Sequence, residues 1–271
     1  MTPRMPNVAA PPLQQGSALQ PMNADVLLRA TGIVRRFGGL TAVDRVSLDL
    51  VRGSIHAVIG TNGAGKSTLI NVLSGEQPAD EGTITLGGTD VTRWPQPKRA
   101  RAGLGRTYQR STVFQSFTVL ENCRLCAQAR HQHVLSYGAA AACAASLDDA
   151  RHALAKTRLE ALADRIVATL SHGQRRQLEV AMCIATRPQL LLLDEPLAGM
   201  GGEESATMLE LLASLREGHA IMLVEHDMDA VFRVADRITV MVNGSVIASD
   251  TPGAVRANAA VQTAYLGEAV A

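Results

Sequence analysis

A glycine-rich segment that starts at residue 60 has the residue types needed to bind a nucleoside triphosphate. Residues 60–68 match the pattern G-x-x-x-x-G-K-[ST], with an apolar run before them and a helical pattern after them. A backbone that wraps around phosphates needs glycine at strained positions, and the following helix N-terminus adds positive potential. Lys66 can supply charge to the β- and γ-phosphates, and Ser67 can offer a hydroxyl to Mg²⁺. The predicted nucleotide-binding residues are Gly60, Thr61, Asn62, Gly63, Ala64, Gly65, Lys66, Ser67 and Thr68.

Two consecutive carboxylates follow a run of four leucines at residues 190–193. Such a run is expected of a strand that is covered on both faces. It would place Asp194 and Glu195 at the carboxyl end of a central strand, where ligands bind in open α/β sheets. Asp194 suits the coordination of Mg²⁺, and Glu195 suits a general base that accepts a proton from the attacking water. A strand that ends in Asp-Glu is common, so this prediction depends on the phosphate loop upstream.

A sheet is needed to position these residues, and the alternation of patterns predicts one. Strand patterns cover residues 26–37, 43–51, 54–59, 82–88, 190–193 and 220–224, and Asn243-Gly244 predicts a hairpin turn between two more strands. Helical patterns lie between them, and residues from about 111 to 185 are mostly helical, with capping-box patterns at Thr118 and at Ser146. We therefore expect an α/β fold of the P-loop NTPase class. It would combine a mainly parallel sheet, an N-terminal antiparallel β subdomain and an inserted helical subdomain.

Composition narrows the functional classes. The net charge is +1, from 26 basic and 25 acidic residues, so nucleic acid is not expected as a partner. The local basic stretch that contains Lys98, Arg99, Arg101 and Arg106 is interpreted as a solvated helix face. The four cysteines, at 123, 126, 143 and 183, are too few and too scattered for a disulfide scaffold. They are interpreted as reduced thiols of a cytoplasmic protein.

The N-terminal segment differs in composition from the rest of the chain. Five of the eleven prolines fall within the first 21 residues, with glutamine and serine between them. This composition predicts a disordered, proline-rich tail over residues 1–24, followed by one domain over residues 25–271. Because no apolar run is long enough to span a bilayer, the protein is not expected to be integral to a membrane.

Further motifs carry a resemblance to a known family. Residues 170–177, Leu-Ser-His-Gly-Gln-Arg-Arg-Gln, resemble the LSGGQ signature of ABC ATPases, with His172 in place of the usual first glycine. Gln109 resembles the Q-loop glutamine of that family, and His226 resembles its switch histidine. Phe37, 23 residues before Gly60, lies where the family places an aromatic ring that stacks on adenine. The resemblance covers residues 25–271 and joins these motifs in the order that the family shows.

The resemblance implies a mechanism in which two such domains meet head to tail. ATP on one phosphate loop would be capped by Ser171, Gly173 and Gln174 of the other domain, which present a helix N-terminus to the γ-phosphate. Gln109 would contact Mg²⁺ and the attacking water, and His226 would hold the γ-phosphate. The implied catalytic residues are Glu195, His226, Gln109 and Lys66, and the implied ligands of Mg²⁺ are Ser67, Gln109 and Asp194. One departure is Gly201, which stands where the family usually has a D-loop aspartate or asparagine. The usual D-loop contact across the dimer is therefore not expected, and hydrolysis is expected to be slower or differently coupled.

Several segments resemble one branch of the importers, which takes up branched-chain (hydrophobic) amino acids. They include Arg-Thr-Tyr-Gln at 106–109, Glu-His-Asp-Met at 225–228 and Tyr-Leu-Gly-Glu at 265–268. Systems of this branch pair two different ATPase subunits with two permeases and a periplasmic binding protein, so the chain is expected to act on the inner membrane face. Leu-Ser-His-Gly-Gln and Ala-Gly-Met also resemble its urea and short-amide members, and substrate selection resides in other chains.

Three alternatives remain open at the level of sequence. An ATPase of the lipopolysaccharide-export type has a similar Tyr-Leu-Gly-Glu ending, but its family usually shows a Leu-Pro-Gln Q-loop and an Asp-His switch. A soluble ABC ATPase of translation or DNA repair mostly has two cassettes or a long coiled coil, whereas this chain has one cassette and no such insert. A nucleotide-binding module without turnover is the third alternative, because Gly201 departs from the D-loop pattern.

Overall fold

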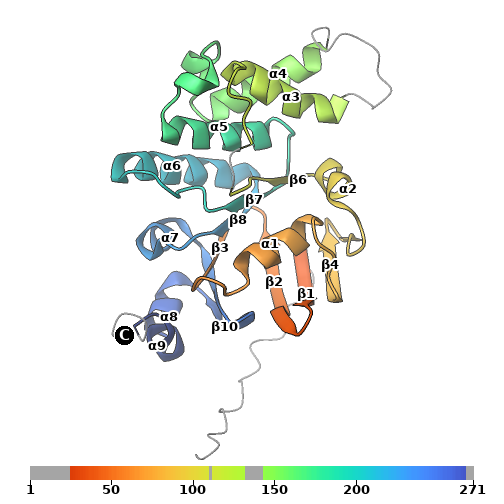
Figure 1. Ribbon diagram of the computed structural model, residues 1–271, viewed down its shortest axis with the longest axis vertical. Helices are drawn as coiled ribbons and strands as arrows, with labels where there is room; N and C mark the ends of the chain where they lie inside the picture. The colour runs from red at the N-terminus through yellow and green to blue at the C-terminus, as the bar shows by residue number, and fades with distance from the viewer. Residues whose placement is uncertain (1–24, 110–111, 132–142, 267–271) are drawn as a thin grey trace, which may run out of the picture.

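The molecule contains two sheets, of which the larger lies in the middle and the smaller at one side (Figure 1). The computed structural model describes residues 25–109, 112–131 and 143–266. The predicted tail, residues 1–24, and the end of the chain, residues 267–271, therefore lie outside the described part. The strands are β1 (Val26–Phe37), β2 (Leu40–Val51), β3 (Ile55–Gly60), β4 (Glu81–Leu86), β5 (Thr89–Asp90), β6 (Leu104–Arg106), β7 (Leu190–Asp194), β8 (Ala220–Val224), β9 (Arg237–Val242) and β10 (Ser245–Asp250).

The two sheets differ in direction. Strands β2, β1, β4 and β5 form an antiparallel sheet in that order, and the larger sheet has the order β10-β9-β3-β8-β7-β6. In the larger sheet every neighbouring pair is parallel except β9 and β10, which the Asn243-Gly244 turn joins as a hairpin. Asn243 and Gly244 both have positive φ, 48° and 83°, as a type I′ turn requires. This turn is confirmed, and so is the predicted fold class.

The central strands are buried on both faces, and their side chains alternate between two cores. Leu191 and Leu193 of β7 pack into one core, whereas Leu190 and Leu192 pack into the other. The first core contains the helices α5 to α7, and the second contains α1 and the antiparallel sheet. Since successive residues of a strand point to opposite faces, a strand between two apolar layers must be apolar throughout. This explains the run of four leucines.

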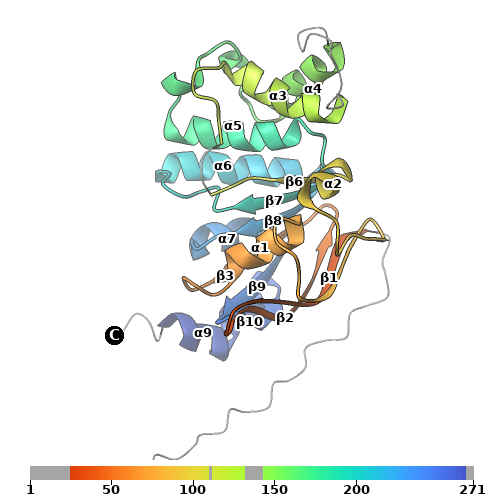
Figure 2. The same cartoon turned by 45° about the vertical axis from the view of Figure 1, so that its right-hand side comes forward.

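The helices cover both faces of the larger sheet (Figures 1 and 2). Their bounds are α1 (Lys66–Ser74), α2 (Gln96–Arg101), α3 (Val119–His131), α4 (Ala144–Lys156), α5 (His172–Ile184), α6 (Gly202–Leu215), α7 (Met228–Val234), α8 (Pro252–Ala257) and α9 (Ala259–Leu266). Helices α3, α4 and α5 come between β6 and β7 in the chain and pack together at one end of the molecule. None of these helices, within the described ranges, is long and apolar enough to cross a membrane.

One of the two predicted capping boxes is wrong. The Thr118 box is confirmed, because the Glu121 amide donates to Thr118 Oγ1 at 3.1 Å and Glu121 Oε2 accepts from the Thr118 amide at 2.7 Å. Ser146, in contrast, lies inside α4, which begins two residues earlier, and its hydroxyl donates to the Cys143 carbonyl at 2.8 Å. In the helix interior a serine satisfies its hydroxyl on the preceding turn, so the pattern did not mark the start of the helix.

The interpretation of the basic stretch as a solvated face is wrong for two of its four arginines and lysines. Lys98 and Arg101 are exposed, as expected. Arg99 is 1% exposed, and its guanidinium donates to the carbonyls of Val72 and Leu73 at the end of α1, at 2.9 and 2.8 Å. The Val72 carbonyl also accepts from the Gly75 amide that caps α1, at 3.1 Å, so Arg99 adds a charged donor to carbonyls at the buried end of this helix. Burial lowers the pKa of Arg99 to about 10.

Candidate nucleotide-binding site

The glycine-rich loop lies between β3 and α1, and two of its glycines are required by close backbone contacts. A Cβ at Gly60 would collide with the Met241 carbonyl oxygen, and a Cβ at Gly65 would collide with that of Ala42. Gly65 also has a φ of 96°, which L-residues rarely adopt. The loop is therefore pressed against β9 and β2 and turns sharply into the N-terminus of α1. This is the strand, loop and helix order that a phosphate-binding loop needs.

Lys66 points back into the curve of this loop. Its ammonium donates to the carbonyls of Gly60 at 2.7 Å and Thr61 at 3.0 Å. Burial lowers the pKa of Lys66, while the nearby carboxylates of Glu195 and Asp194 oppose that shift. The cation is thus held in the loop between backbone oxygens and the acidic end of β7. A bound phosphate would replace weak neutral acceptors with a charged one.

The two carboxylates at the end of β7 have different environments. Asp194 is 4% exposed, and burial raises its pKa, although Arg106 opposes the shift. Glu195 has a left-handed backbone conformation with φ 49°, and its amide donates to the Val224 carbonyl of β8 at 2.9 Å. A non-glycine residue in this region costs free energy that the surroundings must supply. This left-handed conformation ends the extended course of β7, so that Glu195 no longer continues the strand.

The Gln109 side chain contacts Glu195 at the carboxyl end of the larger sheet. Gln109 Nε2 donates to Glu195 Oε2 at 3.2 Å, which brings two predicted catalytic residues together from segments 86 positions apart. One carboxylate oxygen is thereby held by the amide, and the other has no partner among the hydrogen bonds of the described residues. The Gln109 carbonyl also accepts from Arg176 of α5 at 3.4 Å. The Q-loop therefore contacts both the end of β7 and the helix that follows the signature.

Glu225 joins the loops after β7 and β8, a role that sequence reasoning did not assign. It is fully buried, and its carboxylate accepts from the Leu197 amide at 2.8 Å and the His226 amide at 3.2 Å. Burial raises its pKa, and these two hydrogen bonds oppose the shift. Its neighbour His226 has a side chain that is 61% exposed, so the ring is accessible at the sheet edge. In the sequence, Glu225 follows the apolar run of β8 and directly precedes His226, and no pattern there shows that its carboxylate is buried.

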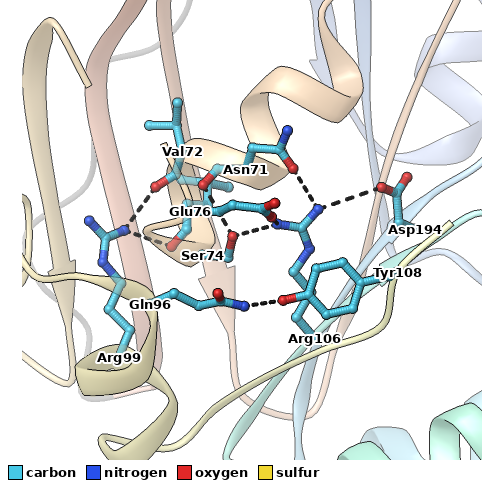
Figure 3. Close-up of polar contacts among 10 residues, drawn as sticks. Asn71, Val72, Ser74, Glu76, Gln96, Arg99, Arg106, Tyr108 and Asp194 are labelled. Atoms are coloured by element: carbon cyan, nitrogen blue, oxygen red, sulfur yellow. Dashed lines mark hydrogen bonds and ion pairs between the residues drawn. The ribbon is translucent and has the colours of Figure 1, made fainter. Parts of the chain in front are cut away.

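Arg106 is the centre of a polar network behind the site (Figure 3). Its side chain is only 6% exposed, and it donates to Asn71 Oδ1 at 2.5 Å, Ser74 Oγ at 2.7 Å and Glu76 Oε2 at 2.6 Å. The same guanidinium lies 3.8 Å from Asp194 Oδ2 and above the ring of Tyr108. It therefore ties the far end of α1 to the end of β7 and to the residue before Gln109. This corrects the prediction that Arg106 is solvated.

The signature segment begins helix α5, away from the phosphate loop of the same chain. Ser171 caps α5 in a capping box with Gln174: the Gln174 amide donates to Ser171 Oγ at 3.2 Å, and the Ser171 amide donates to Gln174 Oε1 at 3.0 Å. In Figures 1 and 2, helix α6 and strands β7 and β8 lie between α5 and α1. One chain thus carries a phosphate loop and a separate helix N-terminus, which fits the expectation that a second domain supplies the cap.

Phe37 and Ser67 occupy exposed positions. Phe37, at the end of β1, is 43% exposed, with the Arg35 guanidinium 4.8 Å from its ring centroid. Its ring is accessible for stacking. Ser67 is exposed at the first turn of α1. Within the described ranges no cluster of three or more histidine, cysteine or acidic residues could hold a metal ion alone. A hydroxyl, one buried carboxylate and phosphate oxygens are nevertheless a donor set that fits Mg²⁺, which usually keeps few protein ligands.

Comparisons with known proteins agree with this arrangement. A family model described as "ABC transporter" matches residues 43–198, and one described as "Branched-chain amino acid ATP-binding cassette transporter" matches residues 245–271. The chain is 40% identical over 254 residues to the high-affinity branched-chain amino acid transport ATP-binding protein LivG of Escherichia coli, covering 90% of this chain and 98% of that one. It is 38% identical over 252 residues to BraF, the protein of the same description from Pseudomonas aeruginosa, with the same coverage.

Solved structures agree with the fold. A nucleotide-free ATP-binding cassette from an ABC transporter superposes with a TM-score of 0.80 at 29% identity, covering 89% of this chain and 98% of that one. The ADP conformation of an ATP-binding cassette superposes with a TM-score of 0.78 at 29% identity, covering 89% and 99%. These cassettes share the arrangement of sheets and helices described above.

Proposed function

Because the chain belongs to the ABC transporter family, as an ATP-binding subunit of the branched-chain amino acid type, we propose that it powers uptake of branched-chain amino acids or related small amino acids and amides. It is an ATPase that couples hydrolysis to transport, and cassettes of this family work as dimers with permease subunits. We assign to it two separate permeases, a second ATPase subunit in head-to-tail contact and, indirectly, a periplasmic binding protein. The subunit then works at the cytoplasmic face of the membrane.

The observation that carries the hydrolytic part is the hydrogen bond between Gln109 and Glu195. It holds one carboxylate oxygen and leaves the other for the attacking water. Glu195 takes a proton from that water as it attacks the γ-phosphate. Gln109 orients both Glu195 and the attacking water. Because the Gln109 carbonyl also contacts α5, displacement of the Q-loop by a permease changes the position of Glu195.

The other residues bind and neutralise the triphosphate. Lys66 pairs with the β- and γ-phosphates, and the loop amides of residues 60–68 surround them. Ser67, Gln109 and Asp194 are suited to hold Mg²⁺, which neutralises charge that develops on the phosphates. His226 donates to the γ-phosphate, and Phe37 stacks on the adenine. Ser171, Gly173 and Gln174 cap the nucleotide that is bound to the partner subunit. We call this two-chain arrangement the composite site.

The substrate assignment rests on the family branch. The C-terminal match at residues 245–271 favours the branched-chain amino acid type over the lipopolysaccharide-export type. Similarity of the cassette alone does not identify a substrate, since a fructose import ATP-binding protein of Rhizobium meliloti is 37% identical over 222 residues. The permease and the binding protein therefore have to be identified with the ATPase.

The test is affinity purification of the tagged chain from membranes in detergent, followed by reconstitution of the complex into liposomes. We expect two permeases and a second ATPase subunit to co-purify. ATP turnover in the liposomes should rise with a binding protein that is loaded with leucine, isoleucine or valine, and should rise less with fructose or urea. Recovery without any membrane subunit would contradict the transport role. Equal stimulation by every solute would contradict the substrate assignment.

A further inference from the structure

An acidic side chain of the same chain already contacts the signature segment. Glu204, in the first turn of α6, accepts a hydrogen bond through Oε1 from Ser171 Oγ at 3.1 Å and another from the Gly173 amide at 3.2 Å. The contact with Gly173 is close, because a Cβ there would lie 2.6 Å from the Glu204 carboxyl carbon. The absence of a side chain at Gly173 is what lets the carboxylate approach the helix end.

The two donors that Glu204 engages are those that the composite site assigns to the γ-phosphate of the partner's ATP. A hydroxyl and an amide at the N-terminus of a 13-residue helix form a favourable place for an anion. A carboxylate and a phosphate cannot both accept from this pair of donors at hydrogen-bond distance. Like charges so close together also repel strongly when water is excluded.

We propose that Glu204 is a further residue of the composite site, an internal anion that occupies the phosphate-binding corner in the separate subunit and leaves it when the partner's ATP arrives. The inference rests on the proposed capping role of Ser171 and Gly173. Each closing event then exchanges an intramolecular carboxylate for an intermolecular phosphate. The exchange weakens ATP-driven association. After phosphate release it favours rebinding of the Glu204 carboxylate to Ser171 and Gly173.

The geometry around Glu204 allows this exchange without a change in the fold. Glu204 is partly exposed, and its carboxylate adjoins an open cavity of about 210 Å³ that Gln177 and Thr207 also line. Rotation about side-chain bonds can therefore move the carboxylate from the donors into solvent while α6 stays in place. Ser171 and Gln174 keep their capping box, which does not involve Glu204. The corner that receives the phosphate thus remains formed.

The neighbouring acid provides a matched control. Glu203 is also in the first turn of α6 and has the same charge, but it is exposed and makes no hydrogen bond through its carboxylate among the described residues. Neutralising either residue removes one negative charge from the same helix end. Only the change at 204 removes the acceptor from Ser171 and Gly173. A difference between the two variants therefore reports the contact and not the net charge.

The experiment measures ATP-driven association of the full chain by sedimentation velocity, titrating MgATP. An E195Q background is used so that bound ATP persists, with E204Q and E203Q added in turn. Replacing a charged acceptor with a neutral one weakens its hydrogen bonds, so we expect E204Q to lower the ATP concentration for half-maximal association by about five- to tenfold. E203Q should change it by less than about twofold, since an exposed charge contributes little. Thermal unfolding of each variant without nucleotide checks that the fold is retained.

The outcomes separate this inference from the proposed function. If E195Q associates with ATP but E204Q matches E203Q or needs more ATP, Glu204 only fastens α6 to α5, and the inference is overturned. If no variant associates at any ATP concentration, either alone or with the co-purified second ATPase subunit and permeases, the composite site itself fails and Glu204 has no such role. A third variant, E204D, keeps the charge but shortens the side chain, and association at an ATP concentration between those of the parent and E204Q would support displacement.

Discussion

The replacement of Arg106 by methionine tests whether the polar network around Arg106 stabilises the folded chain. Methionine has a similar length and no charge, so Arg106→Met removes the guanidinium with little change in volume. The change deprives Asn71 and Ser74 of a charged donor and removes one of the two cations near the Asp194 carboxylate, which is 4% exposed; Lys66 remains. Arg101→Met, an exposed arginine at the end of the neighbouring helix, is the matched control.

The magnitude follows from the burial of each partner. Glu76 has a side chain that is 44% exposed, so its ion pair with Arg106 contributes at most about 1 kcal/mol. The hydrogen bonds to Asn71 and Ser74 involve a charged donor and together contribute roughly 2–3 kcal/mol, reduced because the free groups regain some water. The pair with Asp194 is long, at 3.8 Å, and adds little by itself. We expect a total loss of about 3–4 kcal/mol in the free energy of unfolding.

Thermal unfolding without nucleotide, followed by circular dichroism, measures this loss. At roughly 2–4 °C per kcal/mol for a domain of this size, Arg106→Met should lower Tm by about 6–16 °C and Arg101→Met by less than about 2 °C. The deficit should shrink as the pH falls, because the raised pKa of Asp194 rises further without the arginine and a protonated carboxyl needs no cation. Equal Tm values for the two variants would refute the network as a net source of stability.

Three further predictions concern the site and the pH dependence. Lys66→Ala should abolish ATP binding or turnover, since Lys66 is the only charged residue of the loop at residues 60–68. Titration with a fluorescent nucleotide measures binding, and phosphate release measures turnover. Glu195→Gln should lower turnover by about 10²- to 10⁴-fold while ATP still binds, and unchanged phosphate release in that variant would rule out Glu195 as the base. Burial lowers the pKa of His56 from 6.5 to about 4, so the unfolded chain binds a proton there before the native one does. Stability should therefore fall by up to about 3 kcal/mol between pH 7 and pH 4, and urea unfolding of His56→Gln should show a weaker fall.

Residues whose chemistry is local could be predicted from the sequence. The phosphate loop depends on glycines at positions that no other residue fits, so the pattern at residues 60–68 carries its own structural reason. The leucines of β7 were interpretable for the same kind of reason, because a strand between two cores has no polar face. The hairpin turn at Asn243 and Gly244 needs two positive φ angles, which few residue pairs provide.

Residues whose role depends on the fold were not predictable. Arg99 and Arg106 lie in one basic stretch with Lys98 and Arg101, and nothing in the spacing separates the buried from the exposed pair. The end of α1 lies beside Arg99 and Arg106 only after the sheet has formed, and then supplies the carbonyls and side chains that they satisfy. The same holds for Glu204, whose partners Ser171 and Gly173 lie 33 and 31 positions away. Whether a charged side chain is buried depends on segments that are distant in the chain, so the residues next to it in the sequence do not reveal it.

The departure at Gly201 is best understood together with Glu204. Gly201 caps α6 with φ −73° and ψ 168°, a conformation open to any residue, and an added Cβ would meet nothing within 4 Å. The backbone therefore does not require glycine, and an aspartate there would even improve the helix cap. However, the segment before α6 packs against the signature, since a Cβ at Gly199 would lie 3.1 Å from the His172 ring. An aspartate at 201 would add a carboxylate to a segment that already directs Glu204 at the phosphate-binding corner. With glycine at 201, the exchange proposed above would displace a single anion.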